Sequence, residues 1–173
     1  MLACLAVAAL LPLVLGKVVH PLHEDARGGE SIVDFELAGS VDRANEILGT
    51  WRAEGVIDDA KRIQIFDLIY PLIYAAALAG GCLAAAGAWG GAGRVRLATA
   101  GIALAWVASA AAAFDYAENV GLDISLWDEP ATPWPQIAFV AAVLKFAAIY
   151  LSLLYALSGP IAALLARRRA VRV

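Results

Sequence analysis

Three polar residues follow a long uncharged run of the sequence, and their spacing makes them the first candidates for chemistry. Asp115, Glu118 and Asn119 come directly after segment 97–114, which contains no charged residue. They stand at positions i, i+3 and i+4, so on a helix their side chains share one face. A carboxyl group in apolar surroundings can donate or accept a proton in catalysis, so Asp115 and Glu118 are candidate catalytic residues.

Lys145 is the basic residue that these acids are expected to meet. An unpaired charge inside a membrane is costly, so ionised groups in apolar helices seek partners. A helical rise of about 1.5 Å per residue places Asp67, Asp115, Glu118 and Lys145 in one layer near the outer side of the membrane. Three acids then share one base, so at least one carboxyl is expected to hold a proton or to reach water.

Two tyrosines extend this polar layer, since Tyr70 and Tyr74 lie at i+3 and i+7 from Asp67. The layer could be a buried network that fixes the register of the helices, with Tyr116 as a further hydrogen-bonding group. It could instead line an outward-facing cavity, closed by a helix that carries Trp51, for a ligand head group or a proton. Both explanations use the same side chains: Asp67, Tyr70, Tyr74, Asp115, Glu118, Asn119 and Lys145.

The elements that position these residues are predicted to be membrane-spanning helices. The 173-residue chain is 62% hydrophobic and only 17% charged, whereas soluble proteins are about 25% charged. Apolar stretches near the membrane-crossing length of about 20 residues occur at 1–19, 63–89, 97–121 and 135–157. Because residues 1–15 lack a basic start and a clear cleavage site, we expect a retained first helix. The prediction is an all-α, four-helix membrane bundle forming one domain, residues 1–173.

The charges between the apolar stretches predict the orientation. Arg94 and Arg96 join the second and third stretches, and an arginine cluster follows the fourth. Segment 17–62 and the loop with Asp123, Asp128 and Glu129 are acidic. By the positive-inside rule, both termini are expected in the cytoplasm and the acidic loops outside.

Residues 20–62 are predicted to form an outer cap with a short amphipathic helix. Ser40 is a suitable N-cap, and Val41, Ala44, Leu48 and Trp51 repeat at helical spacing before Gly55 ends the helix. Trp51 is expected either to anchor this helix at the membrane interface or to fold it back over the bundle. Residues 33–37 alternate between apolar and polar, which favours an extended segment at 31–37. Because a single strand has no sheet to join, an irregular segment lying over the bundle is the alternative. Pro71 is expected to kink the second span.

Metal, thiol and nucleic-acid chemistry receive little support. His20 and His23 lie beside Glu24 and Asp25 and could ligate zinc, but Pro21 separates the histidines and spacing fixes no third ligand, so a solvated loop is favoured. Cys4 and Cys82 are interpreted as small apolar residues on a reducing side, not as a disulfide. The net charge of −3 and the absence of a basic patch argue against nucleic-acid binding. No cofactor motif is present.

The order of several motifs resembles a family of small bacterial four-helix membrane proteins without an assigned function. The motifs are Ile32-Val33-Asp34-Phe35-Glu36-Leu37-Ala38, Ala44-x-x-Ile47-Leu48-x-x-Trp51, Asp67, Asp115-x-x-Glu118-Asn119 and Lys145. The resemblance implies a bacterial inner-membrane protein and adds Glu36 to the shared polar residues. It implies no activity.

Three functions are compatible with these features. The favoured hypothesis is a protein that binds a lipid-like or hydrophobic molecule, or serves as an accessory membrane subunit, through its outward polar layer. An alternative is a membrane-embedded enzyme that uses Asp115 or Glu118 as acid or base. Another is proton-coupled transport, which four helices could perform only as an oligomer. Membrane lipids, a hydrophobic small molecule and further copies of the chain are the expected partners.

Overall fold

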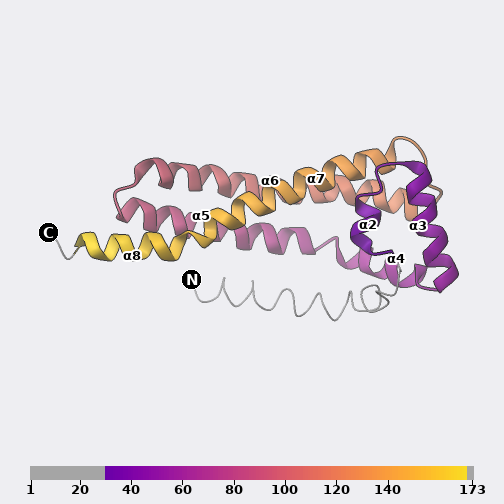
Figure 1. The fold of residues 1–173 in the computed structure, drawn as a ribbon, viewed down its shortest axis with the longest axis horizontal. Coiled ribbons are helices and arrows are strands. Elements are labelled where there is room, and N and C mark those ends of the chain that lie inside the picture. Colours follow the sequence, from indigo (N-terminus) through magenta and orange to yellow (C-terminus); the bar gives the residue numbers. More distant parts are fainter. Residues whose placement is uncertain (1–29, 171–173) are drawn as a thin grey trace. The chain divides into compact units, whose positions relative to one another are not determined.

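The computed structural model describes residues 30–170, and all regular structure in that range is helical. The predicted first span, Cys4, His20 and His23 lie outside the described residues. The helices are α2 (Ile32–Glu36), α3 (Val41–Glu54), α4 (Ile57–Phe66), α5 (Tyr70–Gly91), α6 (Val95–Trp127), α7 (Trp134–Leu157) and α8 (Gly159–Ala170) (Figure 1).

The chain divides into two compact units. Residues 30–71 and 113–145 form one, called here the polar unit, and residues 72–112 and 146–170 belong to the other, the apolar unit. In the described part of the chain, three helical segments are long and apolar enough to cross a membrane: Tyr70–Gly91, Val95–Trp127 and Trp134–Arg168. The chain therefore has the character of a membrane protein.

The second predicted span differs from the structure at its start. Residues 63–89 are not one kinked helix, because α4 ends at Phe66, turns occupy residues 67–69, and α5 begins at Tyr70. Pro71 lies in the first turn of α5, where its missing N–H is not needed, instead of kinking a continuous helix. Asp67 caps α4, so Asp67, Tyr70 and Tyr74 do not form a stripe on a single helix.

The extended or irregular segment expected at residues 31–37 is also wrong, because residues 32–36 form α2, with Ser31 and Leu37 as its caps. A capping box explains the difference: the Asp34 N–H donates to Ser31 Oγ at 3.2 Å, and the Ser31 N–H donates to Asp34 Oδ2 at 2.8 Å. These two bonds satisfy backbone donors at the start of the helix. Local capping therefore outweighs the alternating pattern.

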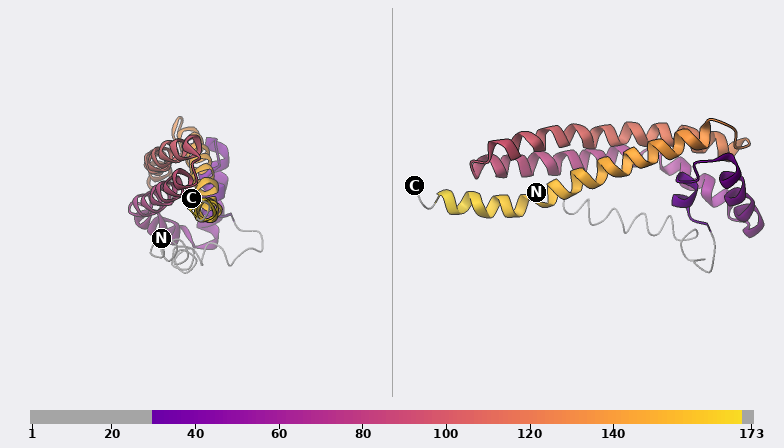
Figure 2. Two further views of the ribbon diagram at one scale, coloured as in Figure 1. Left: turned by 90° about the vertical axis from the view of Figure 1, so that its left-hand side faces the viewer. Right: turned by 45° about the horizontal axis from the view of Figure 1, so that its top comes forward.

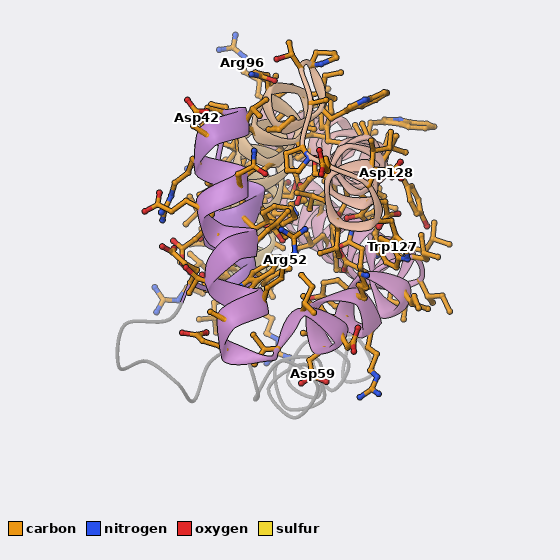
Figure 3. All side chains as sticks on the ribbon, turned by 90° about the vertical axis from the view of Figure 1, so that its right-hand side faces the viewer. Asp42, Arg52, Asp59, Arg96, Trp127 and Asp128 are labelled. Carbon is orange, nitrogen blue, oxygen red and sulfur yellow. The ribbon has the colours of Figure 1, made fainter. Side chains whose placement is uncertain are left out.

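The predicted helix with Trp51 is present as α3. The Arg43 N–H donates to the Ser40 side chain, and Gly55 ends the helix with a φ of 77°, which glycine adopts without a steric penalty. The labelled acids Asp42 of α3 and Asp59 of α4 lie at the periphery of the ribbon (Figure 3).

Trp51 packs α3 against the other helices of the polar unit. Its ring is fully buried and lies 5.1 Å from the ring of Phe35, centroid to centroid, and its Nε1–H donates to the Glu30 carbonyl at 2.8 Å. The same core contains residues of α3, α4, α6 and α7: Ala44, Ile47, Leu48, Ala60, Leu122, Leu126 and Ala138. This packing extends α6 to Trp127, beyond the predicted end at residue 121.

Small residues and side-chain hydrogen bonds to backbone hold the apolar unit together. A Cβ on Gly81 would lie 3.1 Å from that of Ala156, so a small residue at this position lets the two helices approach closely. The free thiol of Cys82 is buried and donates to the Ser152 carbonyl at 3.3 Å, and the Tyr155 hydroxyl donates to the Leu97 carbonyl at 2.8 Å. Figure 2 shows α5 and the first half of α6 side by side.

Two glycines provide a test of this packing within the polar unit. A Cβ on Gly121 would lie 2.8 Å from the Trp134 carbonyl oxygen, whereas one on Gly49 would meet nothing within 4 Å. Gly121→Ala should lower the free energy of unfolding by about 1–3 kcal/mol, because backbone must shift. Gly49→Ala should raise it by up to about 1 kcal/mol through helix propensity. Thermal unfolding of the detergent-solubilised variants measures both, and equal effects of the two substitutions would contradict this packing.

Candidate functional site

Lys145 of α7 is the centre of a buried charge cluster in the polar unit. Its Nζ lies 2.7 Å from Glu118 Oε2, 3.5 Å from Asp115 Oδ1 and 3.5 Å from Glu36 Oε2. Asp115 and Glu118 come from one face of α6, as their spacing predicts, and Glu36 comes from the end of α2. The predicted contact of Lys145 with the two acids of α6 is therefore present, and α2 adds a third carboxyl.

The side chains of the cluster are almost completely buried. The exposed fractions of the side chains are 0% for Glu118, 3% for Asp115, 6% for Lys145 and 11% for Glu36. Within residues 30–170, the cluster sets one ammonium against three carboxyls, so we expect at least one carboxyl to hold a proton. Burial raises the pKa of Glu36 above its ordinary range, and the charge of Lys145 opposes this rise.

Asn119, beside Glu118, connects the cluster to the break between α4 and α5. Its Oδ1 accepts from Gln64 Nε2 at 3.0 Å, and its Nδ2 lies 3.4 Å from the Asp67 carbonyl. The Tyr116 hydroxyl donates to the next carbonyl, that of Leu68, at 2.9 Å. Side chains of α6 therefore satisfy backbone carbonyls that the break leaves without helical partners.

The structure places the remaining predicted residues in different settings. Asp67 lies near the cluster but is not one of the acids within 4 Å of the Lys145 ammonium; in the described part of the chain these are Glu36, Asp115 and Glu118. The Tyr74 hydroxyl donates to the Ala111 carbonyl at 3.2 Å, within the apolar unit, and Tyr70 is half-buried at the start of α5. Gln64 is a further member of this polar network that was not predicted. Its position three residues before Asp67, between apolar neighbours, is the signal that could have identified it.

Asp67 gives the polar unit a testable pH dependence. Burial, reinforced by the charge of Asp115, raises the pKa of Asp67 from 3.8 to about 7. The folded protein then binds this proton more tightly than the unfolded chain does, so the stability that Asp67 contributes is greatest below about pH 4 and is lost as pH rises to about 7. We expect Asp67→Asn to flatten the decline of melting temperature over this interval. An unchanged slope in the variant would contradict the assignment.

A surface groove lies beside this network in the polar unit. It has a volume of about 360 Å³ and is lined by residues from α4, the break after it and the end of α6: Gln64, Ile65, Leu68, Asp123, Ile124, Trp127 and Asp128. Trp127 and Asp128 are labelled in Figure 3. Since Ile65, Leu68 and Trp127 are 58%, 50% and 48% exposed, a ligand could reach the groove from outside. Gln64 joins its lining to Asn119.

The geometry offers little support for catalysis by Asp115 or Glu118. Both carboxyls lie against Lys145 and are almost completely buried, so a substrate would first have to open the cluster. Within residues 30–170, no group of three or more His, Cys, Asp and Glu side chains could hold a metal ion.

Comparisons with protein-family models, curated proteins and solved structures find no match. Function is therefore inferred from the geometry of the polar unit itself.

Proposed function

We propose that this chain is a polytopic membrane protein that binds a lipid-like amphiphile in the groove between α4 and α6. The observation that carries the proposal is the lining of the groove, which combines exposed apolar side chains with the polar groups of Gln64, Asp123 and Asp128. Binding sites for small amphiphiles have this composition, with an apolar surface and a few polar groups that set orientation.

The buried cluster has a supporting role in this proposal. Lys145 joins α7 to two carboxyls of α6 and one of α2, and Asn119 joins α6 to Gln64 of α4. These contacts hold the helices that carry the groove. Their burial favours the register-fixing explanation of the polar layer over a cavity at the level of Asp115.

The proposed membrane arrangement extends beyond the described residues. Residues 1–19 would supply a fourth membrane helix, α2–α4 would lie on the outer side, and both termini would be cytoplasmic in a bacterial inner membrane. The charge distribution supports this orientation, and the motif order supports the bacterial source. Alkylation of single cysteines introduced at Arg94 and Asp128 by a membrane-impermeant reagent tests it: the Asp128 position should react in intact cells and the Arg94 position should not.

Native mass spectrometry of the detergent-solubilised chain with added phospholipid tests the proposed binding. Ile65→Ala combined with Leu68→Ala removes apolar lining from the groove, and we expect the retained lipid to fall roughly tenfold, the equivalent of about 1.4 kcal/mol. Ile69→Ala combined with Leu72→Ala is the matched control, because both residues are similarly exposed and neither lines the groove. Equal lipid retention by both double variants would reject the groove as the binding site.

Proton-coupled transport is a second candidate, favoured by the three carboxyls around one ammonium. A site that must hold a proton at rest could release it when its surroundings change. Proteoliposomes with an entrapped pH dye would report proton movement. The transport hypothesis expects flux that Glu118→Gln removes, and absence of flux in the unmodified protein would count against it.

A further inference from the structure

We propose that the groove takes a phospholipid whose head group ends in a positively charged nitrogen, either a primary ammonium or a trimethylammonium group. This inference rests on the proposed function, because it names the class of ligand for the same groove.

The charged side chains that line the groove are both acidic. Asp123 and Asp128 lie near the end of α6 and just after it, and the lining residues within 30–170 include no lysine, arginine or histidine. These two carboxylates would repel a head group that carries only negative charge, and no basic side chain of the described lining would offset that repulsion. Charge complementarity therefore favours a cationic nitrogen at this end of the groove.

Asp123 presents an acceptor that the described residues do not satisfy. Its Oδ1 is buried and has no hydrogen-bond partner within residues 30–170. Buried carboxylate oxygens are normally paired. An ammonium group in the groove would supply the missing charge and, for a primary amine, a hydrogen bond.

Trp127 adds a surface suited to the same cation. Its side chain is 48% exposed, and the Nζ of Lys61 lies 5.8 Å from the centroid of its ring. Ammonium groups are attracted to the faces of aromatic rings, and quaternary ammonium ligands are often recognised in this way. Lys61 shows that a cation already reaches this ring in the folded protein.

The contacts between α4 and α6 show where the acyl chains would lie. Lys61 meets Trp127, Gln64 meets Asn119, and Leu68 meets Tyr116, so α4 and the following break run antiparallel to the end of α6. The groove is thus acidic and aromatic near Trp127 and apolar near Leu68. This gradient matches an amphiphile with its cationic end at Asp123 and Asp128 and its chains along Ile65 and Leu68.

Native mass spectrometry of the full chain in a neutral detergent tests the inference with defined probes. Equimolar dioleoyl phosphatidylethanolamine and dioleoyl phosphatidylglycerol share their acyl chains and differ in the head group. We expect the ethanolamine lipid to be retained at roughly five times the level of the glycerol lipid or more. Phosphatidylcholine should show a similar preference, because its quaternary nitrogen carries the same charge.

Two variants, each lacking one acid near the end of α6, distinguish binding at the groove from a general effect of negative charge on lipid retention. Asp123→Asn should bring the ratio of the two lipids close to one, whereas Glu129→Gln, an exposed acid outside the groove lining, should leave it unchanged. An unmodified protein without preference, or an Asp123→Asn protein with the original preference, would overturn the inference.

The alanine variants of Ile65 and Leu68 distinguish this failure from failure of the proposed function. If they lose lipid while the unmodified protein retains both head groups equally, the groove binds lipid but does not select a cation, and the inference is overturned alone. If they retain as much lipid as their control, both the proposed groove and its head-group preference are overturned.

Discussion

Replacing Lys145 with methionine should lower the free energy of unfolding by about 3–5 kcal/mol. The substitution keeps the approximate length of the side chain but removes the ammonium that faces Glu36, Asp115 and Glu118. The three carboxyls would then have to take up protons, or remain charged in a site that water does not reach. Thermal unfolding in detergent, followed by circular dichroism, measures the loss.

Arg62→Met is the control for this experiment, because it also removes a base from an ion pair. Arg62 pairs with Asp59 at 3.2 Å, but its side chain is 74% exposed, so its loss should cost no more than about 1 kcal/mol. If both variants unfolded at the temperature of the unmodified protein, the buried cluster would not contribute to stability.

Trp51→Ala should produce the second large effect, a loss of about 3–5 kcal/mol concentrated in α2 and α3. The fully buried ring contacts Phe35, and its Nε1–H bond to the Glu30 carbonyl would also be lost. Hydrogen exchange measured by mass spectrometry should show faster exchange in peptides from residues 32–54. Because α2 carries Glu36, the contact between Glu36 and Lys145 should weaken at the same time.

Trp106→Ala provides the matched comparison, since the Trp106 side chain is 75% exposed. Exchange in residues 32–54 should then remain at the level of the unmodified protein. Slow exchange in this segment after loss of Trp51 would show that the aromatic core does not hold α2 and α3 in place.

The central pairing could be predicted from sequence because apolar surroundings leave few alternatives. Asp115, Glu118 and Lys145 are the only acidic or basic residues in the apolar stretches 97–121 and 135–157, so the cost of isolated charge predicts that they meet. Glu36 and Gln64 could not be assigned in this way. Their positions depend on how α2 and α4 pack against α6, which involves contacts between residues far apart in the chain.

Local geometry explains the two differences in secondary structure. Residues 33–37 have the alternation of a strand, but the Ser31 and Asp34 capping box starts a helix instead. Near Pro71, composition alone suggests one continuous span, whereas Asn119 and Tyr116 supply hydrogen bonds to the carbonyls of Asp67 and Leu68. These distant partners stabilise a break that hydropathy cannot reveal.

The ion pair between Glu118 and Lys145 is tested most directly by a double-mutant cycle. Free energies of unfolding are measured for the unmodified protein, Glu118→Gln, Lys145→Met and the double variant. The 2.7 Å contact predicts a coupling energy of about 1–3 kcal/mol, with the double variant less destabilised than the sum of the single variants. Additivity within about 0.3 kcal/mol would contradict a buried cluster built around Lys145.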